Sequence, residues 1–390
     1  MRNTVKLKKV KIVGMISLLI AAILIIGIFG FSCVSGLTAV GWSGGTVSND
    51  VLYVGSMEGR LAAINLIDDS RQWGEPLKLQ SQGGLLGCTS VLSCGGGTSR
   101  VPIYGTPIVS DNLVYVAGYN GKIYAYNTVN LAQRWIYPRD NYLSPFVGSL
   151  IVDQNKLYVG CSDGFVYCLD ATTGDLLSQY QTGDKIWGTP IVADDTVYIG
   201  SFDKKLYALD ATDLTPKWEY ATEGSIIAQP LVKDGIVYIG SFDKYLYALD
   251  AASGTLKWKF AGNNWFWTQP VIVNDMLYAG CLDGFIYVLN PTTGATIKIF
   301  DNEEIAIVSP FASQPVVFDN YVIFASQVGI VYRIDTTTQE ITQLAVLTGA
   351  ITGPLTVYEG IIYFQTQDIA IQRVEVATGA LLPSISLISG

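Results

Sequence analysis

Four aspartates recur at intervals of forty residues: Asp163, Asp203, Asp243 and Asp283. They are the most regularly spaced of the side chains that could take part in catalysis or metal binding. Carboxylates in register could bind a divalent cation or accept a proton from a substrate. Each of the four, however, stands in the same short motif between two apolar segments, where turn geometry alone favours Asp. The sequence contains no histidine, which is the commonest general base at neutral pH and the commonest metal ligand. We therefore predict turns at these aspartates, no metal centre and no cofactor.

Charge is distributed unevenly along the chain. The net charge is −9, but five of the 24 basic residues lie within the first eleven positions, which contain no acid. The rest of the chain therefore carries 19 basic and 33 acidic groups, a net charge of −14. A body with this charge repels nucleic acid, so we predict no nucleic-acid partner.

The first forty residues have the pattern of a membrane-targeting segment. The basic residues precede an apolar run over residues 12–31, and twenty helical residues at about 1.5 Å each span a hydrocarbon core of about 30 Å. A cleaved signal peptide usually has a shorter apolar stretch. The sequence GFSC then ends at Cys33, a candidate for lipidation, although Gly30 stands where a lipobox prefers an aliphatic residue. An uncleaved anchor and a lipidated Cys33 are the two alternatives, and both tether the body outside the cytoplasm.

The body of the chain, residues 41–390, repeats itself. GSFDKKLYALDAT at residues 200–212 returns as GSFDKYLYALDAA at residues 240–252, with two differences in thirteen positions. Weaker copies extend the pattern in both directions. Eight copies are recognisable, and they begin at Gly44, Thr106, Ser149, Thr189, Gln229, Gln269, Gln314 and Gly353.

Each copy has the pattern of four short strands, because its apolar runs are rich in β-branched and aromatic residues and are separated by turn residues. Pairs such as Asp163–Gly164 predict tight hairpins in which both central residues have positive φ. Gly174 is expected to be left-handed in the turn DATTG. Four antiparallel strands in about forty residues are typical of a propeller blade. The predicted fold is all-β: a monomeric eight-bladed β-propeller of four-stranded antiparallel blades (residues 41–390), preceded by one N-terminal transmembrane or signal helix (residues 1–40).

The large aromatic residues of the repeat are expected in its core. Tyr198 and Tyr238 occupy equivalent positions in the two nearly identical copies, and both are interpreted as packing residues. Four copies end in a tryptophan that we expect to pack between adjacent blades, where burial of so large a side chain contributes about 2–3 kcal/mol. These are Trp73, Trp135, Trp218 and Trp258.

The cysteines divide into two groups. Cys88 and Cys94 lie six residues apart in a glycine-rich insertion, and an extracytoplasmic compartment permits a disulfide between them; two free thiols are the alternative. Cys161 and Cys281 occupy one position of the repeat and Cys168 another, where other copies have serine or alanine. We expect these three to be small buried residues. No cysteine spacing matches a zinc site.

The copies resemble the pyrroloquinoline-quinone-type repeat, whose consensus contains LYALDATTGKxxW. The segments LYALDATDLTPKW (residues 206–218) and LYALDAASGTLKW (residues 246–258) are close to it, and the resemblance extends from about residue 41 to the C-terminus. It implies the propeller superfamily and leaves function open, because the repeat occurs in quinone dehydrogenases, in the outer-membrane assembly lipoprotein BamB and in surface proteins. The dehydrogenases hold calcium and the quinone in the central funnel, and many have a vicinal disulfide. This chain has no adjacent cysteine pair.

The segments before each first strand differ between copies and are rich in aromatic and polar residues. By analogy with the family they lie at one mouth of the ring, where loops on a rigid scaffold commonly carry binding residues. Alternatively the aromatic rings plug the channel, and the glutamines, which share one position, form an inner ring of hydrogen bonds. Arg139 is interpreted as a lone charge available to a partner. The candidate partner- or ligand-binding residues are Arg139, Phe146, Trp187, Gln229, Trp265, Trp267, Gln269 and Gln314.

Three functions fit these patterns. The first is a membrane-tethered, non-catalytic module of the cell envelope that binds protein partners, similar to BamB in architecture. The second is a quinone-dependent dehydrogenase, which requires Asp, Glu and Asn side chains converging in the funnel. The third is a surface sensor that binds carbohydrate or polymer by stacking on Trp187, Trp265 and Trp267. We favour the first function, and we therefore predict that the chain is not an enzyme.

Overall fold

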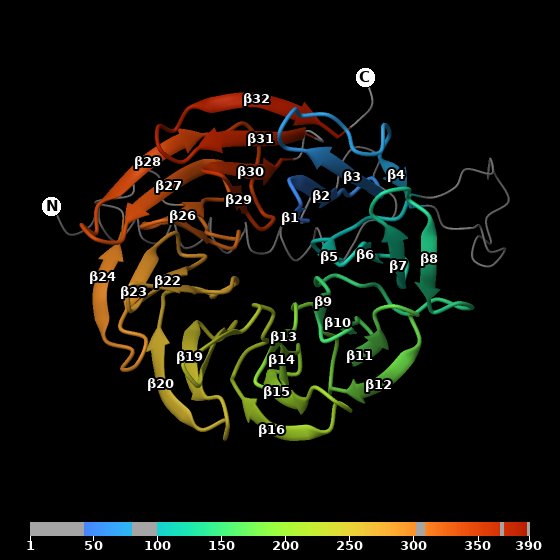
Figure 1. The fold of residues 1–390 in the computed structure, drawn as a ribbon. Helices are drawn as coiled ribbons and strands as arrows, with labels where there is room; N and C mark the ends of the chain where they lie inside the picture. The colour runs from blue at the N-terminus through green and yellow to red at the C-terminus, as the bar shows by residue number, and fades with distance from the viewer. Residues whose placement is uncertain (1–42, 80–99, 302–308, 367–369, 388–390) are drawn as a thin grey trace, which may run out of the picture. The chain divides into compact units, whose positions relative to one another are not determined.

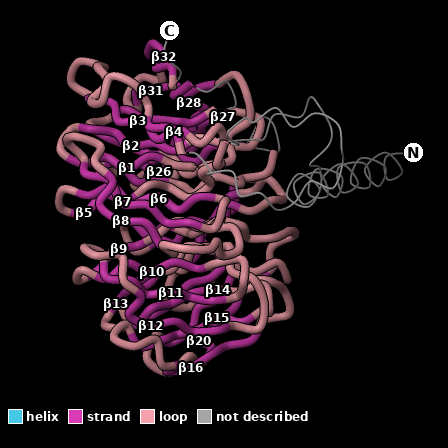
Figure 2. The backbone as a smooth tube through the Cα atoms, turned by 90° about the vertical axis from the view of Figure 1, so that its right-hand side faces the viewer, coloured by secondary structure: helices cyan, strands magenta, loops and turns pink. Residues whose placement is uncertain are grey.

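A computed structural model of the chain describes residues 43–79, 100–301, 309–366 and 370–387. Every regular element within those ranges is a β-strand, and turns or loops join one strand to the next (Figure 2). The described residues contain no helix of the length and hydrophobicity that a membrane span needs. The predicted anchor (residues 1–40), with the lipidation candidate Cys33, and the disulfide candidates Cys88 and Cys94 lie outside the described ranges.

The strands of the described ranges form eight four-stranded antiparallel sheets, blades 1 to 8, each built from four consecutive strands (Figure 1). Blades 1 to 4 consist in order of β1 (Gly45–Ser48), β2 (Val51–Gly55), β3 (Arg60–Asn65), β4 (Leu77–Lys78), β5 (Ile108–Ser110), β6 (Leu113–Gly118), β7 (Lys122–Asn127), β8 (Gln133–Tyr137), β9 (Ile151–Asp153), β10 (Lys156–Gly160), β11 (Phe165–Asp170), β12 (Leu176–Gln181), β13 (Ile191–Ala193), β14 (Thr196–Gly200), β15 (Lys205–Asp210) and β16 (Pro216–Ala221). Blades 5 to 8 consist in order of β17 (Leu231–Lys233), β18 (Ile236–Gly240), β19 (Tyr245–Asp250), β20 (Leu256–Ala261), β21 (Val271–Val273), β22 (Met276–Gly280), β23 (Ile286–Leu289), β24 (Thr296–Phe300), β25 (Val316–Phe318), β26 (Tyr321–Ala325), β27 (Ile330–Asp335), β28 (Ile341–Val346), β29 (Thr356–Tyr358), β30 (Ile361–Gln365), β31 (Ala370–Glu375) and β32 (Leu381–Ser386). The predicted eight-bladed architecture is confirmed.

The core of the propeller lies between its blades. Tyr198 of blade 4, for example, is buried in one cluster with Val237 and Tyr247 of blade 5. A sheet of these short apolar strands has two faces to cover, and only a neighbour on each side covers both. The ring therefore needs all of its blades, which explains why a single repeat is not an independent folding unit.

One backbone carbonyl links blade 4 to blade 5. The Tyr198 hydroxyl and the Trp218 indole N–H, both from blade 4, donate to the Ala251 carbonyl of blade 5, each at 3.0 Å. Trp73 also donates across to the next blade, to the Thr128 carbonyl. The same pairing of a tyrosine and a tryptophan on one carbonyl joins two further blade pairs, through Tyr115 and Trp135 on Ala171 and through Tyr238 and Trp258 on Pro291. The tryptophans dock between blades as predicted.

The Trp218 indole ring also packs against the turn that follows the Ala251 carbonyl. Gly254 has a φ of +70°, and a Cβ there would lie 2.6 Å from the Trp218 ring. Gly174 is left-handed as predicted, with a φ of +73°. Leu214 occupies the corresponding position of blade 4, and its buried side chain packs against blade 3, whose last strand has no tryptophan. Gly254 thus leaves room for the tryptophan at the end of blade 4, whereas Leu214 packs against blade 3, which lacks a tryptophan there.

The turns after the second strands differ from the prediction. At Asp163–Gly164 only the glycine has positive φ, +89°. The aspartate instead caps the turn, because its Oδ1 accepts the Phe165 N–H at 2.9 Å and its Oδ2 accepts the Tyr167 hydroxyl at 3.0 Å. Two consecutive positive φ values occur in the first turn of a blade, at Asp194–Asp195. The other repeated aspartates make the same pair of bonds, with Lys205 and Tyr207 for Asp203, Tyr245 and Tyr247 for Asp243, and Phe285 and Tyr287 for Asp283.

Cys161, Cys168 and Cys281 are free thiols buried in the core, as predicted. The Cys161 thiol donates to the Ser144 carbonyl at 3.2 Å, and Ser201 makes the corresponding bond to the Asp184 carbonyl at 3.1 Å. Burial raises the pKa of each thiol, so these cysteines act as small core residues.

Blades 1 and 8 meet at a seam where neither blade contributes a strand to the other. The Thr356 hydroxyl donates to the Gly45 carbonyl at 2.7 Å, and Tyr358 donates to the Asp50 carboxylate. Arg373, which is 9% exposed, pairs with Asp69 at 2.7 Å. Side-chain bonds and apolar packing therefore close the ring.

The shared carbonyl bond predicts a measurable stability loss. We expect Tyr238→Phe to lower the free energy of unfolding by about 1 kcal/mol, because one donor to the Pro291 carbonyl is lost while the ring remains. Equilibrium urea unfolding measures the change. Tyr142→Phe is the matched control, since that phenol is exposed. A loss in Tyr238→Phe no larger than in the control would contradict this contribution.

Stability is expected to fall above pH 10. Burial raises the pKa of Tyr115 and of Tyr238 to about 12, whereas a phenol in an unfolded chain has a pKa of about 10. Between these values the unfolded chain releases protons that the folded chain keeps, so unfolding becomes easier by up to about 1.4 kcal/mol per pH unit for each such tyrosine. Below pH 10 these tyrosines are protonated in both the folded and the unfolded chain, so their contribution to the free energy of unfolding is fully present. Thermal unfolding across this range tests the prediction, and a midpoint that is constant to pH 12 would refute it.

Candidate functional site

The mouth of the ring is lined by segments that lead from the last strand of one blade into the first strand of the next. Their residues alternate in direction. Phe146 and Ile186 are completely buried, whereas Val147 and Trp187, one position later, line a central hollow. Phe146 is therefore a core residue, and we correct its assignment as a contact residue. The error is one of register, because Phe146 is equivalent to Ile186 and not to Trp187.

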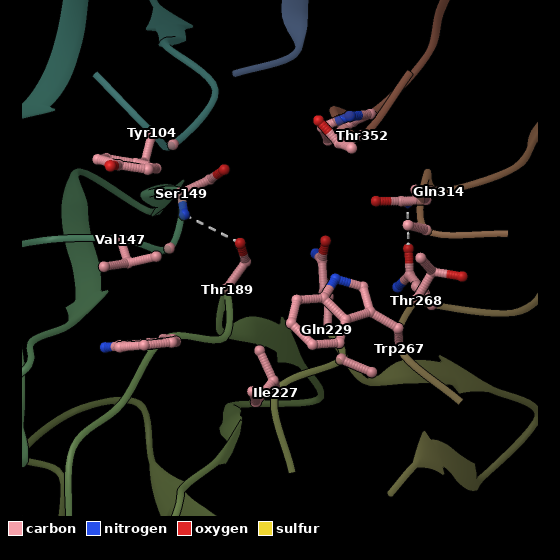
Figure 3. A pocket seen from close by; sticks show the side chains of 17 residues that line it. Tyr104, Val147, Ser149, Thr189, Ile227, Gln229, Trp267, Thr268, Gln314 and Thr352 are labelled. Atoms are coloured by element: carbon pink, nitrogen blue, oxygen red, sulfur yellow. Dashed lines mark hydrogen bonds between the residues drawn. The ribbon is translucent and has the colours of Figure 1, made fainter. Parts of the chain in front are cut away.

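The hollow has a volume of about 700 Å³, part of which is open solvent, and the segments entering blades 2 to 8 line it. Figure 3 shows Tyr104, Thr352, Gln229 and Trp267 arranged around its open centre. None of the described residues that line it is charged. Its surface consists of aromatic rings, amides, hydroxyls, small apolar side chains and backbone. Five of the predicted contact residues meet here: Trp187, Gln229, Trp267, Gln269 and Gln314.

The polar position before each first strand links blades by hydrogen bonds. The backbone N–H of Thr106 donates to the Ser149 hydroxyl at 2.8 Å. The N–H of Ser149 donates to the Thr189 hydroxyl at 3.0 Å (Figure 3). Further around the ring, the Gln314 amide donates to Gln269 Oε1 at 2.6 Å. Of the inner ring of glutamine hydrogen bonds that we considered as an alternative, the bond between Gln314 and Gln269 is present.

Gln229 differs from the two other glutamines at its position. The Gln269 amide donates to the Pro230 carbonyl at 2.7 Å, and its oxygen accepts from Gln314. The Gln229 side chain makes no hydrogen bond with any residue that the structure describes, and it is only partly buried. An amide has two donor hydrogens and one acceptor oxygen. Those of Gln229 are open to the contents of the hollow.

Aromatic rings surround the hollow on the side of blades 4 to 6. The Phe242 ring stacks on Trp265 at 4.3 Å and on Trp267 at 5.2 Å between centroids. Trp187 meets Phe202 edge-on at 4.7 Å. We call these five residues the aromatic rim; all five are partly buried. Trp265 belongs to the aromatic rim but does not line the hollow. Trp187 and Trp267 belong to the rim and also line the hollow.

Two cations, one beside the aromatic rim and one predicted to contact a partner, have different settings. Lys185 Nζ is 4.5 Å from the centre of the Phe202 ring and 5.1 Å from that of Trp187, so it borders the aromatic rim. Arg139 is exposed and pairs with Asp175 at 2.6 Å. Arg139 is thus not the lone charge that the sequence indicated, and it does not line the hollow.

Phe202 and Phe242 were not recognised as site residues from the sequence. Both lie in the motif GSFDK, which reads as a structural turn. A signal was present nevertheless, because the phenylalanine position is Ser162 in blade 3 and Leu282 in blade 6, whereas the aspartate after it does not change. Variation at one position of a constant turn indicates that the turn itself does not require that residue.

The residues of the hollow do not fit a calcium and quinone site. Calcium is bound by carboxylate and carbonyl oxygens, and no carboxylate lines the hollow in the described part of the chain. Those same ranges contain no group of three or more His, Cys, Asp or Glu side chains that could hold a metal ion.

The fold and this neutral, aromatic channel define the protein as a propeller of the pyrroloquinoline-quinone-like repeat class. Residues 35–204 and 182–382 match the family described as "Outer membrane protein assembly factor BamB", and the chain belongs to this family.

Individual relatives are more distant. A curated protein of Kangiella koreensis, "Outer membrane protein assembly factor BamB", is 26% identical over 146 residues, which cover 36% of this chain and 32% of that protein. The match thus spans about a third of the curated relative. The crystal structure of BamB from Moraxella catarrhalis superposes with a TM-score of 0.66 at 20% identity, over 83% of this chain and 91% of that one. The computationally designed protein Ika8 superposes with a TM-score of 0.68 at 15% identity, over 87% and 97%. At these identities the two structures establish the fold alone.

The composition of the hollow predicts that quinone and calcium do not bind. We expect the mass of the native full-length chain to be unchanged when both are added, because none of the described residues that line the hollow offers a carboxylate to the cation. Native mass spectrometry measures this, with a quinone-dependent dehydrogenase as positive control. A stoichiometric mass increase that requires both components would refute the prediction.

Proposed function

We propose that this chain is a non-catalytic, protein-binding propeller of the cell envelope that acts as a scaffold in the assembly of envelope proteins. Membership of a family described as an outer-membrane assembly factor supports this role. We further propose that residues 1–40 tether the propeller, residues 41–390, to a membrane outside the cytoplasm, through an uncleaved apolar segment or a lipidated Cys33.

The aromatic rim is the single observation on which the docking role rests. Five large, partly exposed rings from neighbouring blades lie at one mouth of the ring in two stacked or edge-on groups, with Lys185 beside the first of them. Tryptophan and other aromatic residues dominate the energy of protein interfaces, because they bury a large area at a small cost in conformational entropy. A rim of this kind needs no catalytic group to fulfil its role.

Photo-crosslinking in the producing cells tests the docking surface. With a photoreactive phenylalanine analogue at Phe242 in the full-length chain, we expect one or a few discrete protein adducts. Trp265→Ala in the same chain is expected to weaken them strongly, because loss of a hot-spot residue costs about 2 kcal/mol, about thirtyfold in affinity.

The analogue at Leu176 is the matched control, since that side chain is 44% exposed on the last strand of blade 3. No adduct from Phe242, or equal adducts from Phe242 and Leu176, would refute the aromatic rim as the docking surface.

A further inference from the structure

The hollow has features that a plug of packed aromatic rings would lack. It contains a free amide at Gln229, while the equivalent amides of Gln269 and Gln314 are used within the ring. Gln229 is only partly buried, so its amide is accessible from the hollow and can bond to water or to a ligand there.

The chemistry of the lining restricts what could bind. No described residue that lines the hollow is charged, so among these residues a phosphate, a carboxylate or an ammonium group would lose its hydration without gaining an ionic partner. The body's net charge of −14 also disfavours anions. A suitable ligand is uncharged and has many hydroxyl groups, because Gln229 and Thr189 offer donors and acceptors of neutral character.

An aromatic surface adds a second requirement. The Trp267 indole lines the hollow, and the Phe242 ring stacks against it from the rim. The face of an indole carries partial negative charge and attracts weakly positive C–H groups. A sugar ring has such C–H groups on its face and hydroxyls around its edge. Figure 3 shows Gln229 and Trp267 on the same side of the hollow, where one ring could meet both.

We propose that the channel hollow binds an uncharged sugar residue, with its ring against Trp267 and neighbouring hydroxyls bonded to the Gln229 amide. The amide donates through Nε2 and accepts through Oε1, which matches two adjacent hydroxyl groups. This site shares Trp267 with the aromatic rim, but its hydrogen bonds come from Gln229, which is not part of the rim.

Saturation-transfer NMR with the full-length chain tests the proposal. The chain is held in a detergent without a sugar headgroup. The probes are neutral oligosaccharides of glucose, galactose, mannose and N-acetylglucosamine at about 10 mM, tenfold above a dissociation constant of about 1 mM. At least one probe is expected to receive saturation. Uronic-acid oligosaccharides are expected to receive none.

Gln229→Leu keeps the size of the side chain and removes its hydrogen bonds. We expect it to weaken sugar binding about tenfold or more and to leave the crosslink from Phe242 intact. Leu176→Ala is the matched control: this exposed side chain lies on the last strand of blade 3, outside the hollow and the rim, so the variant should leave sugar binding unchanged. Because Gln229→Leu is expected to affect sugar binding and not the crosslink, it separates failure of this proposal from failure of the docking surface.

Three results would overturn the proposal. The first is that none of the neutral probes binds. The second is that the acidic oligosaccharides bind as well as the neutral ones. The third is that Gln229→Leu binds sugar like the unmodified chain, as it would if the Gln229 amide contacted only water.

Discussion

The propeller depends on a carbonyl oxygen that is shared between blades. At three interfaces this oxygen accepts both a tyrosine hydroxyl and a tryptophan indole from the preceding blade, so its two lone pairs are used by one neighbour. The tyrosine comes from the second strand and the tryptophan from the fourth. Each such blade is therefore held to the next one through two of its strands. Together the two bonds set the angle between successive blades.

That angle brings the first strands so close around the axis that little room is left for side chains. A Cβ at Gly148 would lie 2.5 Å from the Gly188 carbonyl oxygen. The residues on either side of these small positions, such as Val147 and Ser149, consequently face the channel. The same packing that closes the ring thus selects which residues form its central surface. Charged side chains are absent from that surface within the described ranges, and aromatic rings gather beside it.

The sequence predicted the fold well because each blade repeats its own local rules. Eight copies, the docked tryptophans and the left-handed Gly174 all follow from patterns within forty residues. The site was harder to predict, since it depends on register and on contacts between blades. Phe146 and Trp187 look alike in sequence, yet one position separates core from channel. Gln229 and Gln269 occupy equivalent positions, but only Gln269 bonds within the ring. Arg139 forms an ion pair with Asp175, which lies thirty-six residues further along the chain, so no local pattern could predict it.

The seam between blades 1 and 8 bears on how this chain could gain blades by duplication. Each sheet is encoded by one unbroken stretch, and neither terminal blade contributes a strand to the other. Copying about forty codons therefore inserts a complete blade, with its carbonyl, its turn and its donors, without disturbing any existing sheet. Blades 4 and 5, which differ at only two of thirteen positions in GSFDKKLYALDAT, have the likeness expected of a recent tandem duplication. Residues of the seam such as Arg373 and Asp69 are under a different constraint, because each must match a partner in the blade at the other end of the repeat array.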